Sequence, residues 1–246
     1  MLVLLPPSET KAAGGNGPPL DLATLSFPEL HSARESLLHT VIELCRDLPA
    51  ARIRVGVPAS LDPELIGNTR LRSAATLPAI RRYTGVLYDA LDAGTMTRSE
   101  TARAAERLAV ASALFGLIRP ADRIPGYRLS AGSRPFATGT IAAHWRESFG
   151  QLAAGLEGAV VDLRSGAYSA FGAIPGAIAV RVVTEMPSGQ RQIVSHFNKH
   201  TKGLLARALA VTRAEVTDLP GVLRVARRAG LRVERSGPAS IEIVTG

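Results

Sequence analysis

The sequence predicts a single α/β domain over residues 1–246, with a mixed parallel and antiparallel sheet flanked by helices. Strand-like and helical segments intermingle along the chain, and paired strands gather toward the C-terminus, which favours a sheet of mixed direction. A chain of 246 residues is long enough to bury a full core. A hydrophobic fraction of 46% and a charged fraction of 20% are typical of a globular protein.

Each predicted element rests on apolar periodicity and on the residues at its ends. Short apolar runs predict strands at 2–5, 110–115 and 159–163, and hairpins at 177–197 and 231–244. Apolar positions at helical spacing predict helices at 29–47, 99–109, 138–154 and 198–210. Pro28 suits the start of the first helix, Ser99 is expected to cap the second, and Asn198 the last. The stretch 116–135 is a long irregular loop, and loops of this length inside compact domains are usually functional.

The apolar N-terminus reads as a strand, since MLVLLPP is too short for the apolar region of a signal peptide. No apolar run approaches the ~18 residues needed to cross a bilayer, so we expect no membrane segment. The single cysteine, Cys45, cannot form an internal disulfide, which fits a reducing compartment. These features together predict a cytoplasmic protein.

Four polar segments follow predicted strands, at the positions where α/β sheets bind ligands. Their candidate side chains are Ser8, Glu9, Thr10 and Lys11; Arg119, Asp122, Arg123, Tyr127 and Arg128; Asp162, Arg164, Ser165 and Tyr168; and Ser195, His196, Asn198, Lys199, His200 and Lys202. If the four segments converge, they form a cationic pocket that also holds hydroxyls and carboxylates. Such a pocket suits anion binding and acid–base chemistry.

Only three of the 29 basic residues are lysines, and all three lie in these segments: Lys11, Lys199 and Lys202. Lysine binds an oxyanion as a point charge, or loses its proton and acts as a base or nucleophile. A helix that starts at Asn198 would place Lys199 and Lys202 on one face near its first turn. Cations are disfavoured there unless an anion offsets them, so the pair indicates a bound anion or a nearby carboxylate such as Asp162. The competing interpretation is a solvated helix face.

Several motifs carry less weight. The chain has neither a dinucleotide fingerprint nor a phosphate-binding P-loop, so we expect no cofactor. His196 and His200 have the spacing of zinc ligands but no third ligand is evident, so we expect no metal site. Ser8 and Ser165 lack the motif of a serine nucleophile. Residues 219–230 suggest a helix-hairpin-helix element, although a turn followed by an arginine-bearing helix is the simpler interpretation.

A set of segments resembles the YaaA family of peroxide stress proteins over essentially the whole chain. The SETK sequence near the N-terminus resembles an actinobacterial-type branch of this family. The segments are LPPSETK, RRYTGVLYDAL, LFGLIRPADRIPGYRLSAG, HW, VVDLRSGAY and SHFNKHTKGLLAR. The resemblance implies one unusual α/β domain in the cytoplasm, a role in the hydrogen peroxide response and restraint of free iron. It also implies binding of double-stranded or distorted DNA through the block from Ala113 to Pro120, in which Ala113 replaces a glycine and Gly116 is kept. The YTG motif adds Tyr83, Thr84 and Gly85 to the expected ligand contacts.

Three functions remain open on the sequence. The net charge of +8 favours anionic partners, and Arg119, Arg123 and Arg128 would contact phosphates in a DNA-binding protein. An enzyme acting on a nucleotide, a nucleobase derivative or a phosphorylated metabolite would use the same cations, with Lys11, Lys199, Lys202, Tyr127 and Asp162 as catalytic candidates. A metal-handling protein is the weakest hypothesis, because the possible metal ligands are few and scattered. The partner is therefore DNA or a small anionic ligand.

Overall fold

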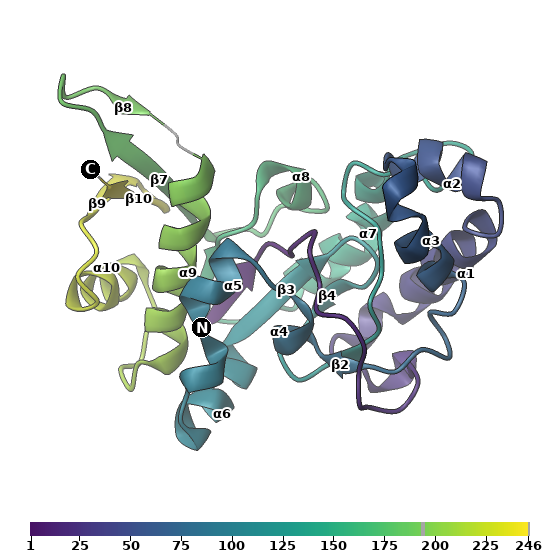
Figure 1. Ribbon diagram of the computed structural model, residues 1–246. Helices are drawn as coiled ribbons and strands as arrows, with labels where there is room; N and C mark the ends of the chain where they lie inside the picture. Colours follow the sequence, from purple (N-terminus) through teal and green to yellow (C-terminus); the bar gives the residue numbers. More distant parts are fainter. Residues whose placement is uncertain (193–194, 246) are drawn as a thin grey trace.

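The computed structural model of the chain describes residues 1–192 and 195–245, except for the side chains of 195–197. It is an α/β domain built on one mixed sheet (Figure 1). The strands of this sheet are β1 (Leu2–Leu5), β3 (Leu108–Ser112), β4 (Gly116–Ile118), β6 (Val160–Asp162), β7 (Ile178–Glu185), β8 (Arg191–Gln192), β9 (Val233–Gly237) and β10 (Ser240–Thr245). A second, two-stranded sheet pairs β2 (Leu77–Pro78) with β5 (Arg123–Ile124). The predicted single α/β domain is confirmed.

Helices of very different length surround the sheet. They are α1 (His31–Leu44), α2 (Leu48–Val55), α3 (Asp62–Asn68), α4 (Ala79–Arg82), α5 (Val86–Leu91), α6 (Arg98–Arg107), α7 (Ile141–Ala154), α8 (Gly166–Ser169), α9 (Ser195–Val211) and α10 (Leu219–Arg228). Figure 1 shows α5, α6 and α9 in front of the sheet, whereas α1, α2 and α3 form a separate group at the right of the view. Helix α9 contacts β1, β7, α5 and α6, so it is the central helix of the front layer.

The main sheet has a parallel centre and antiparallel edges. Its strand order is β4-β3-β1-β6-β7-β10-β9, and β8 pairs with the far end of β7. The pairs β3–β1, β1–β6, β6–β7 and β7–β10 are parallel, whereas β4 and β9 are antiparallel to their neighbours. Every residue of β1 and β3 is buried, as expected for parallel strands covered on both faces.

The predicted helix over 29–47 is shorter than expected and is followed by a second helix. A 3-10 turn at Pro28–Leu30 leads into α1, which ends at Leu44. Helix α2 then starts within four residues because the Asp47 carboxylate accepts a hydrogen bond from the Ala50 amide and a proline lies in its first turn. The prediction missed α2, whose apolar periodicity is weak.

Helix α6 begins and ends earlier than predicted. Thr97, not Ser99, is its cap, and the Glu100 carboxylate accepts a hydrogen bond from the Thr97 amide to complete a capping box. The helix gives way to β3 at Leu108. Residues 116–118, predicted as loop, form β4 because their backbone pairs with the outer edge of β3.

The C-terminal elements follow the prediction except at one helix start. The hairpins β7–β8 and β9–β10 are present, and 219–228 is a helix capped by Asp218, as the simpler interpretation expects. Helix α9 begins at Ser195, so the prediction that Asn198 caps it is wrong, and Lys199 lies in its second turn. Among the described residues no helix is long and apolar enough to cross a membrane.

Candidate functional site

A cleft of about 620 Å³ opens at the carboxyl ends of β1 and β6, and we call it the switch-point cleft. The chain passes from β1 to β3 on one side of it, and later adds β6 on the other side. Open parallel sheets bind ligands where the strand order reverses in this way, because the loops after the two strands diverge and leave a crevice. The cleft is therefore placed where the fold favours a ligand.

The structure brings three of the four predicted polar segments into this cleft, whereas no residue of the segment 116–135 lines it. The side chains predicted from the sequence that line it are Ser8, Glu9, Thr10, Thr84, Gly85, Arg164, Ser165, Tyr168, Asn198, Lys199 and Lys202. Sequence reasoning missed Arg181, which projects from an exposed position of β7 beside two buried valines. The alternation of exposed and buried residues along β7 is the signal that could have found it.

Three hydroxyls form a chain on one wall of the cleft. The Ser8 and Thr10 hydroxyl oxygens lie 3.1 Å apart, and the Thr84 hydroxyl donates to the Thr10 oxygen over 3.2 Å. Gly85, with φ of 95°, passes beneath them, and a Cβ there would lie 3.4 Å from the Ser8 and Thr10 oxygens. A glycine suits this positive φ and lets the backbone approach the hydroxyls.

Lys202 fixes the loop that follows β6. Its ammonium donates to the backbone oxygens of Leu163, over 3.0 Å, and Arg164, over 3.4 Å. Burial lowers the pKa of this ammonium, and the Asp162 carboxylate opposes the shift. An ammonium has three donors, so one N–H remains beyond these two bonds. Lys199, by contrast, is exposed at the rim of the cleft.

Lys11 fixes the loop that follows β1 in the same way, although it does not line the cleft. Its ammonium donates to the backbone oxygens of Ser8, over 3.1 Å, and Glu9, over 3.2 Å, and lies 4.2 Å from the centre of the Tyr127 ring. Burial lowers its pKa from 10.5 to about 8, against the opposing effect of the Glu9 carboxylate. Two of the three lysines thus tie down the two loops that define the cleft.

The tyrosines beside Lys11 form a buried hydrogen-bond network. The Tyr127 hydroxyl lies 2.9 Å from both the Tyr83 and the Ser112 hydroxyl. Burial raises the pKa of Tyr83 to about 12 and that of Tyr127 well above its ordinary value. Burial also raises the pKa of Tyr168, which lines the cleft. All three phenols are therefore neutral near pH 7.

Asp162 and Arg128 take part in contacts that the sequence did not reveal. The Asp162 carboxylate accepts two hydrogen bonds from the buried Arg164 guanidinium, over 3.0 and 2.8 Å, rather than one from a lysine. The Arg128 guanidinium reaches the Glu9 backbone oxygen at 3.4 Å and the Glu64 carboxylate at 3.5 Å. Arg128 and Lys11 therefore both donate to the Glu9 backbone oxygen, on the side of the loop after β1 that is away from the cleft.

Two predicted ligand contacts lie elsewhere in the fold. Gly116 starts the buried strand β4, where an added Cβ would lie 2.9 Å from the Trp145 ring. Arg119 packs over the Phe27 ring, 5.0 Å from its centre, and also donates to the backbone oxygen of Leu108. The block from Ala113 to Pro120 is thus largely a buried β-hairpin and its flank, not an exposed surface. The side chain of His196 lies outside the described residues.

The described lining of the cleft is strongly cationic. Arg181, Lys199 and Lys202 contribute positive charge, whereas the charge of the buried Arg164 is offset by Asp162, and Glu9 is the carboxylate among the described lining residues. The described part of the chain contains no group of three or more metal-ligating side chains. The arrangement suits an anion held by ammonium and guanidinium groups and by the neighbouring hydroxyls.

Comparison with known proteins assigns the chain to a family. The family described as peroxide stress protein YaaA matches residues 1–236. The chain belongs to this family. It is 50% identical to a UPF0246 protein of Corynebacterium efficiens over 240 residues, which cover 95% of each chain. It is 43% identical to a UPF0246 protein of Streptomyces coelicolor over 245 residues, covering 97% of this chain and 94% of the relative.

A more distant relative shows how the similarity falls off. A UPF0246 protein of Cereibacter sphaeroides is 32% identical over 251 residues, covering 95% of this chain and 94% of the relative. The higher identities to the actinobacterial proteins confirm the expected actinobacterial-type branch. The membership predicted from the sequence motifs is confirmed as well.

Proposed function

We propose that the switch-point cleft binds a small anionic ligand, of the class of nucleotides, nucleobase derivatives or phosphorylated metabolites. The observation that supports this proposal is the excess of cationic over acidic groups in a hollow at the topological switch point. Its size of about 620 Å³ fits a small ligand rather than a duplex, because pockets for small molecules span roughly 300–1,000 Å³.

The two lysines of the cleft have different parts in this proposal. Lys202 is partly buried and holds the backbone oxygen of Leu163 while one N–H stays free for the ligand. Lys199 is exposed, so its contribution is a screened charge at the rim. The hydroxyls of Ser8, Thr10 and Ser165 supply neutral hydrogen bonds around the anion.

Calorimetric titration with pyrophosphate and with adenosine monophosphate tests the proposal. Lys202→Met should weaken binding by about 10- to 100-fold, the usual range for a hydrogen bond to a charged group. Lys199→Met should weaken it by about two- to fivefold, as for an exposed ion pair. Arg213→Ala, at an exposed arginine between α9 and α10 that does not line the cleft, is the control and should leave binding unchanged. Equal affinity of wild type and Lys202→Met would contradict the proposal.

The same cleft supports an enzymatic role. The pKa of the Lys202 ammonium is lowered by burial, and a lysine shifted toward neutrality serves as a general base. The Ser165 hydroxyl lines the same cleft and supplies a further proton donor to a substrate held there. Prolonged incubation of the protein with a nucleotide panel, followed by phosphorus and proton NMR, tests this role. New resonances in wild type that are absent with Lys202→Met support it, and unchanged spectra count against it.

DNA binding is a second candidate function, favoured by the net charge of +8 and by helix α10. Arg224, Arg227 and Arg228 are all exposed on this helix. Such binding should weaken steeply with salt, because each phosphate contact releases condensed counterions. Retardation of duplex DNA in a mobility shift that is lost in the triple alanine variant of these arginines supports this function. Absence of retardation at moderate salt removes it.

At the cellular level, we propose that the chain acts in the cytoplasm in the response to hydrogen peroxide, as its family description suggests. A deletion strain complemented with wild type or with Lys202→Met tests this role by survival after peroxide exposure. Loss of rescue with the variant would link the cleft to the response. Equal rescue would separate the cleft from it, and equal survival with and without the gene would remove the peroxide role.

A further inference from the structure

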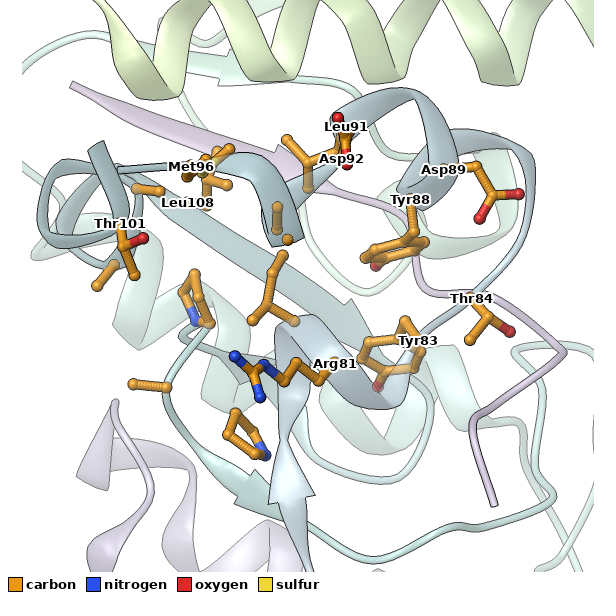
Figure 2. A pocket seen from close by; sticks show the side chains of 18 of the residues that line it. Arg81, Tyr83, Thr84, Tyr88, Asp89, Leu91, Asp92, Met96, Thr101 and Leu108 are labelled. Atoms are coloured by element: carbon orange, nitrogen blue, oxygen red, sulfur yellow. The ribbon is translucent and has the colours of Figure 1, made fainter. Parts of the chain in front are cut away.

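A second hollow, of about 680 Å³, lies beside the cleft between α4, α5, α6 and the segment 120–123, and we call it the α4–α6 pocket. It shares Thr84 and Tyr88 with the lining of the switch-point cleft. Figure 2 shows its side chains converging from these elements. Its volume is in the range of pockets that hold drug-sized molecules, roughly 300–1,000 Å³. Nothing in the proposed role of the cleft uses this pocket.

The inner surface of the pocket is apolar. Leu91, Ala104 and Leu108 are buried and contribute aliphatic carbons. Tyr83 and Tyr88 add two stacked rings with centres 5.5 Å apart. Their hydroxyls are bonded outside the pocket, since that of Tyr83 lies 2.9 Å from the Tyr127 hydroxyl and that of Tyr88 donates to the Pro6 backbone oxygen over 2.8 Å. The rings therefore face the pocket with carbon, which favours an apolar or aromatic ligand body.

Two arginines line this pocket, Arg81 and Arg123, and neither has an acidic partner in the described part of the chain. Arg81 is exposed on α4 and lines the pocket, and no described carboxylate lies within ion-pair distance of it. Figure 2 shows its guanidinium extending along the pocket. Arg123 also lines the pocket, but its guanidinium packs against Gly17, where an added Cβ would lie 2.0 Å from its nitrogen. Arg81 is thus the group placed to receive an anion.

The opposite side of the pocket limits how much negative charge a ligand can carry. Asp89 and Asp92 are exposed there and line the pocket. The Arg207 guanidinium lies 3.8 Å from the Asp92 carboxylate and partly offsets its negative charge. Two carboxylates facing the same hollow disfavour a polyanion such as a nucleotide, because like charges repel across a short distance. A single negative group at Arg81, with an uncharged body toward the aspartates, satisfies both sides.

We propose that the α4–α6 pocket binds a small apolar monocarboxylate, with its carboxylate on Arg81 and its body against Tyr83, Tyr88 and Leu108. A guanidinium forms a bidentate pair with a carboxylate, which fixes the orientation of the ligand. The apolar body supplies most of the affinity by leaving water. The site adjoins the anion cleft but uses none of its cations, so it stands or falls independently of the proposed function of that cleft.

The test uses naphthoate and decanoate as probes, each compared with its uncharged amide, in calorimetric titrations with the full chain. Wild type should bind each acid about tenfold more tightly than its amide, the contribution of one charge-assisted contact. Arg81→Ala should remove this preference and leave the amide affinity within about twofold, since the apolar surface is unchanged. Arg213→Ala, at an exposed arginine that lines neither hollow, should behave as wild type.

A second variant locates the binding in the pocket. Ala121 is exposed and lines the pocket, so Ala121→Trp should place an indole in it without disturbing the core. Loss of binding of both acid and amide in this variant supports the proposal. The proposal is overturned if neither acid saturates the protein at millimolar concentration. It is also overturned if Arg81→Ala keeps the preference for the acid, or if Ala121→Trp binds as wild type does.

Discussion

Gly203 is the position where a single methyl group should most clearly separate two helices of the site. It lies in α9, one residue after Lys202, and faces α5. A Cβ at Gly203 would lie 2.3 Å from the backbone oxygen of Leu87 and 2.7 Å from the Cβ of Ala90. Carbon–oxygen contacts begin at about 3.3 Å, so Gly203→Ala requires α9 and α5 to move apart by about 1 Å.

The expected loss of stability follows from two opposing effects. Replacing glycine by alanine inside a helix stabilises it by about 1 kcal/mol. Overpacking usually costs about 1–3 kcal/mol, and the upper end applies because the main obstacle is a backbone oxygen rather than a flexible side chain. The net effect is a destabilisation of about 2 kcal/mol. For chains of this size that corresponds to a fall in Tm of about 4–8 °C.

Gly150 in α7 provides the matched control. It is also inside a helix, but nothing lies within 4 Å of the Cβ that would be added. Gly150→Ala should therefore raise the free energy of unfolding by about 0.5–1 kcal/mol, from helix propensity alone. Urea denaturation followed by circular dichroism measures both variants. If Gly203→Ala stabilises the protein as much as Gly150→Ala does, the close approach of α5 and α9 is not real.

Three further changes test the cap, the buried ion pair and the lysine beneath the first loop. Thr97→Ala removes the capping box of α6 and should lower the free energy of unfolding by about 1 kcal/mol, measured by urea denaturation. Ser99→Ala should leave that free energy nearly unchanged. Asp162→Asn should cost about 3 kcal/mol in the same assay, because it leaves the buried guanidinium of Arg164 without its charged partner. Since the pKa of Lys11 falls to about 8 on folding, the unfolded chain binds more protons between pH 8 and 10.5. Wild type should therefore gain stability relative to Lys11→Met as pH rises through that window, measured as the difference in Tm at pH 7 and pH 10.

Matched variants decide each of these outcomes. Glu43→Gln breaks the exposed ion pair with Arg46 and should lower the free energy of unfolding by less than about 1 kcal/mol. If Asp162→Asn costs no more than Glu43→Gln does, the ion pair of Asp162 with Arg164 is not buried. For the lysine, the comparison of wild type with Lys11→Met is itself the matched pair. A Tm difference between wild type and Lys11→Met that stays constant over that range would refute burial of the Lys11 ammonium. A larger effect of Ser99→Ala than of Thr97→Ala would refute the assigned cap.

Much of the fold was predictable because its signals are local. The strand at 2–5, the helix around Trp145 and the two C-terminal hairpins have strong apolar patterns and clear turn residues, and all are present. Helix α2 and the short helices α4 and α5 were missed, because their ends depend on particular caps and their lengths give little periodicity. The strand at 116–118 was missed because its backbone pairing with β3 leaves no mark on the sequence.

The candidate site was predictable in part. The segments that line the cleft were found because they follow strands and concentrate polar residues. The alternation along β7 marks Arg181 as exposed, but only the packing of the strand places it at the cleft. Gly116, predicted to contact a ligand, instead leaves room for the Trp145 ring. The placement of Lys11 behind its own loop depends on backbone oxygens, which every residue type supplies equally.

The sequence by itself determined the class of fold, the family and the segments that carry polar chemistry, since each depends on residue types in order along the chain. Only the tertiary structure decided that Lys202 faces the cleft while Lys11 lies beneath its wall, and that the arginine-rich block serves a buried hairpin and a second pocket. The reason is physical. Residue types set the local preference for helix or strand and the charge of each segment. The direction of a side chain depends on which surfaces are buried when distant strands pair.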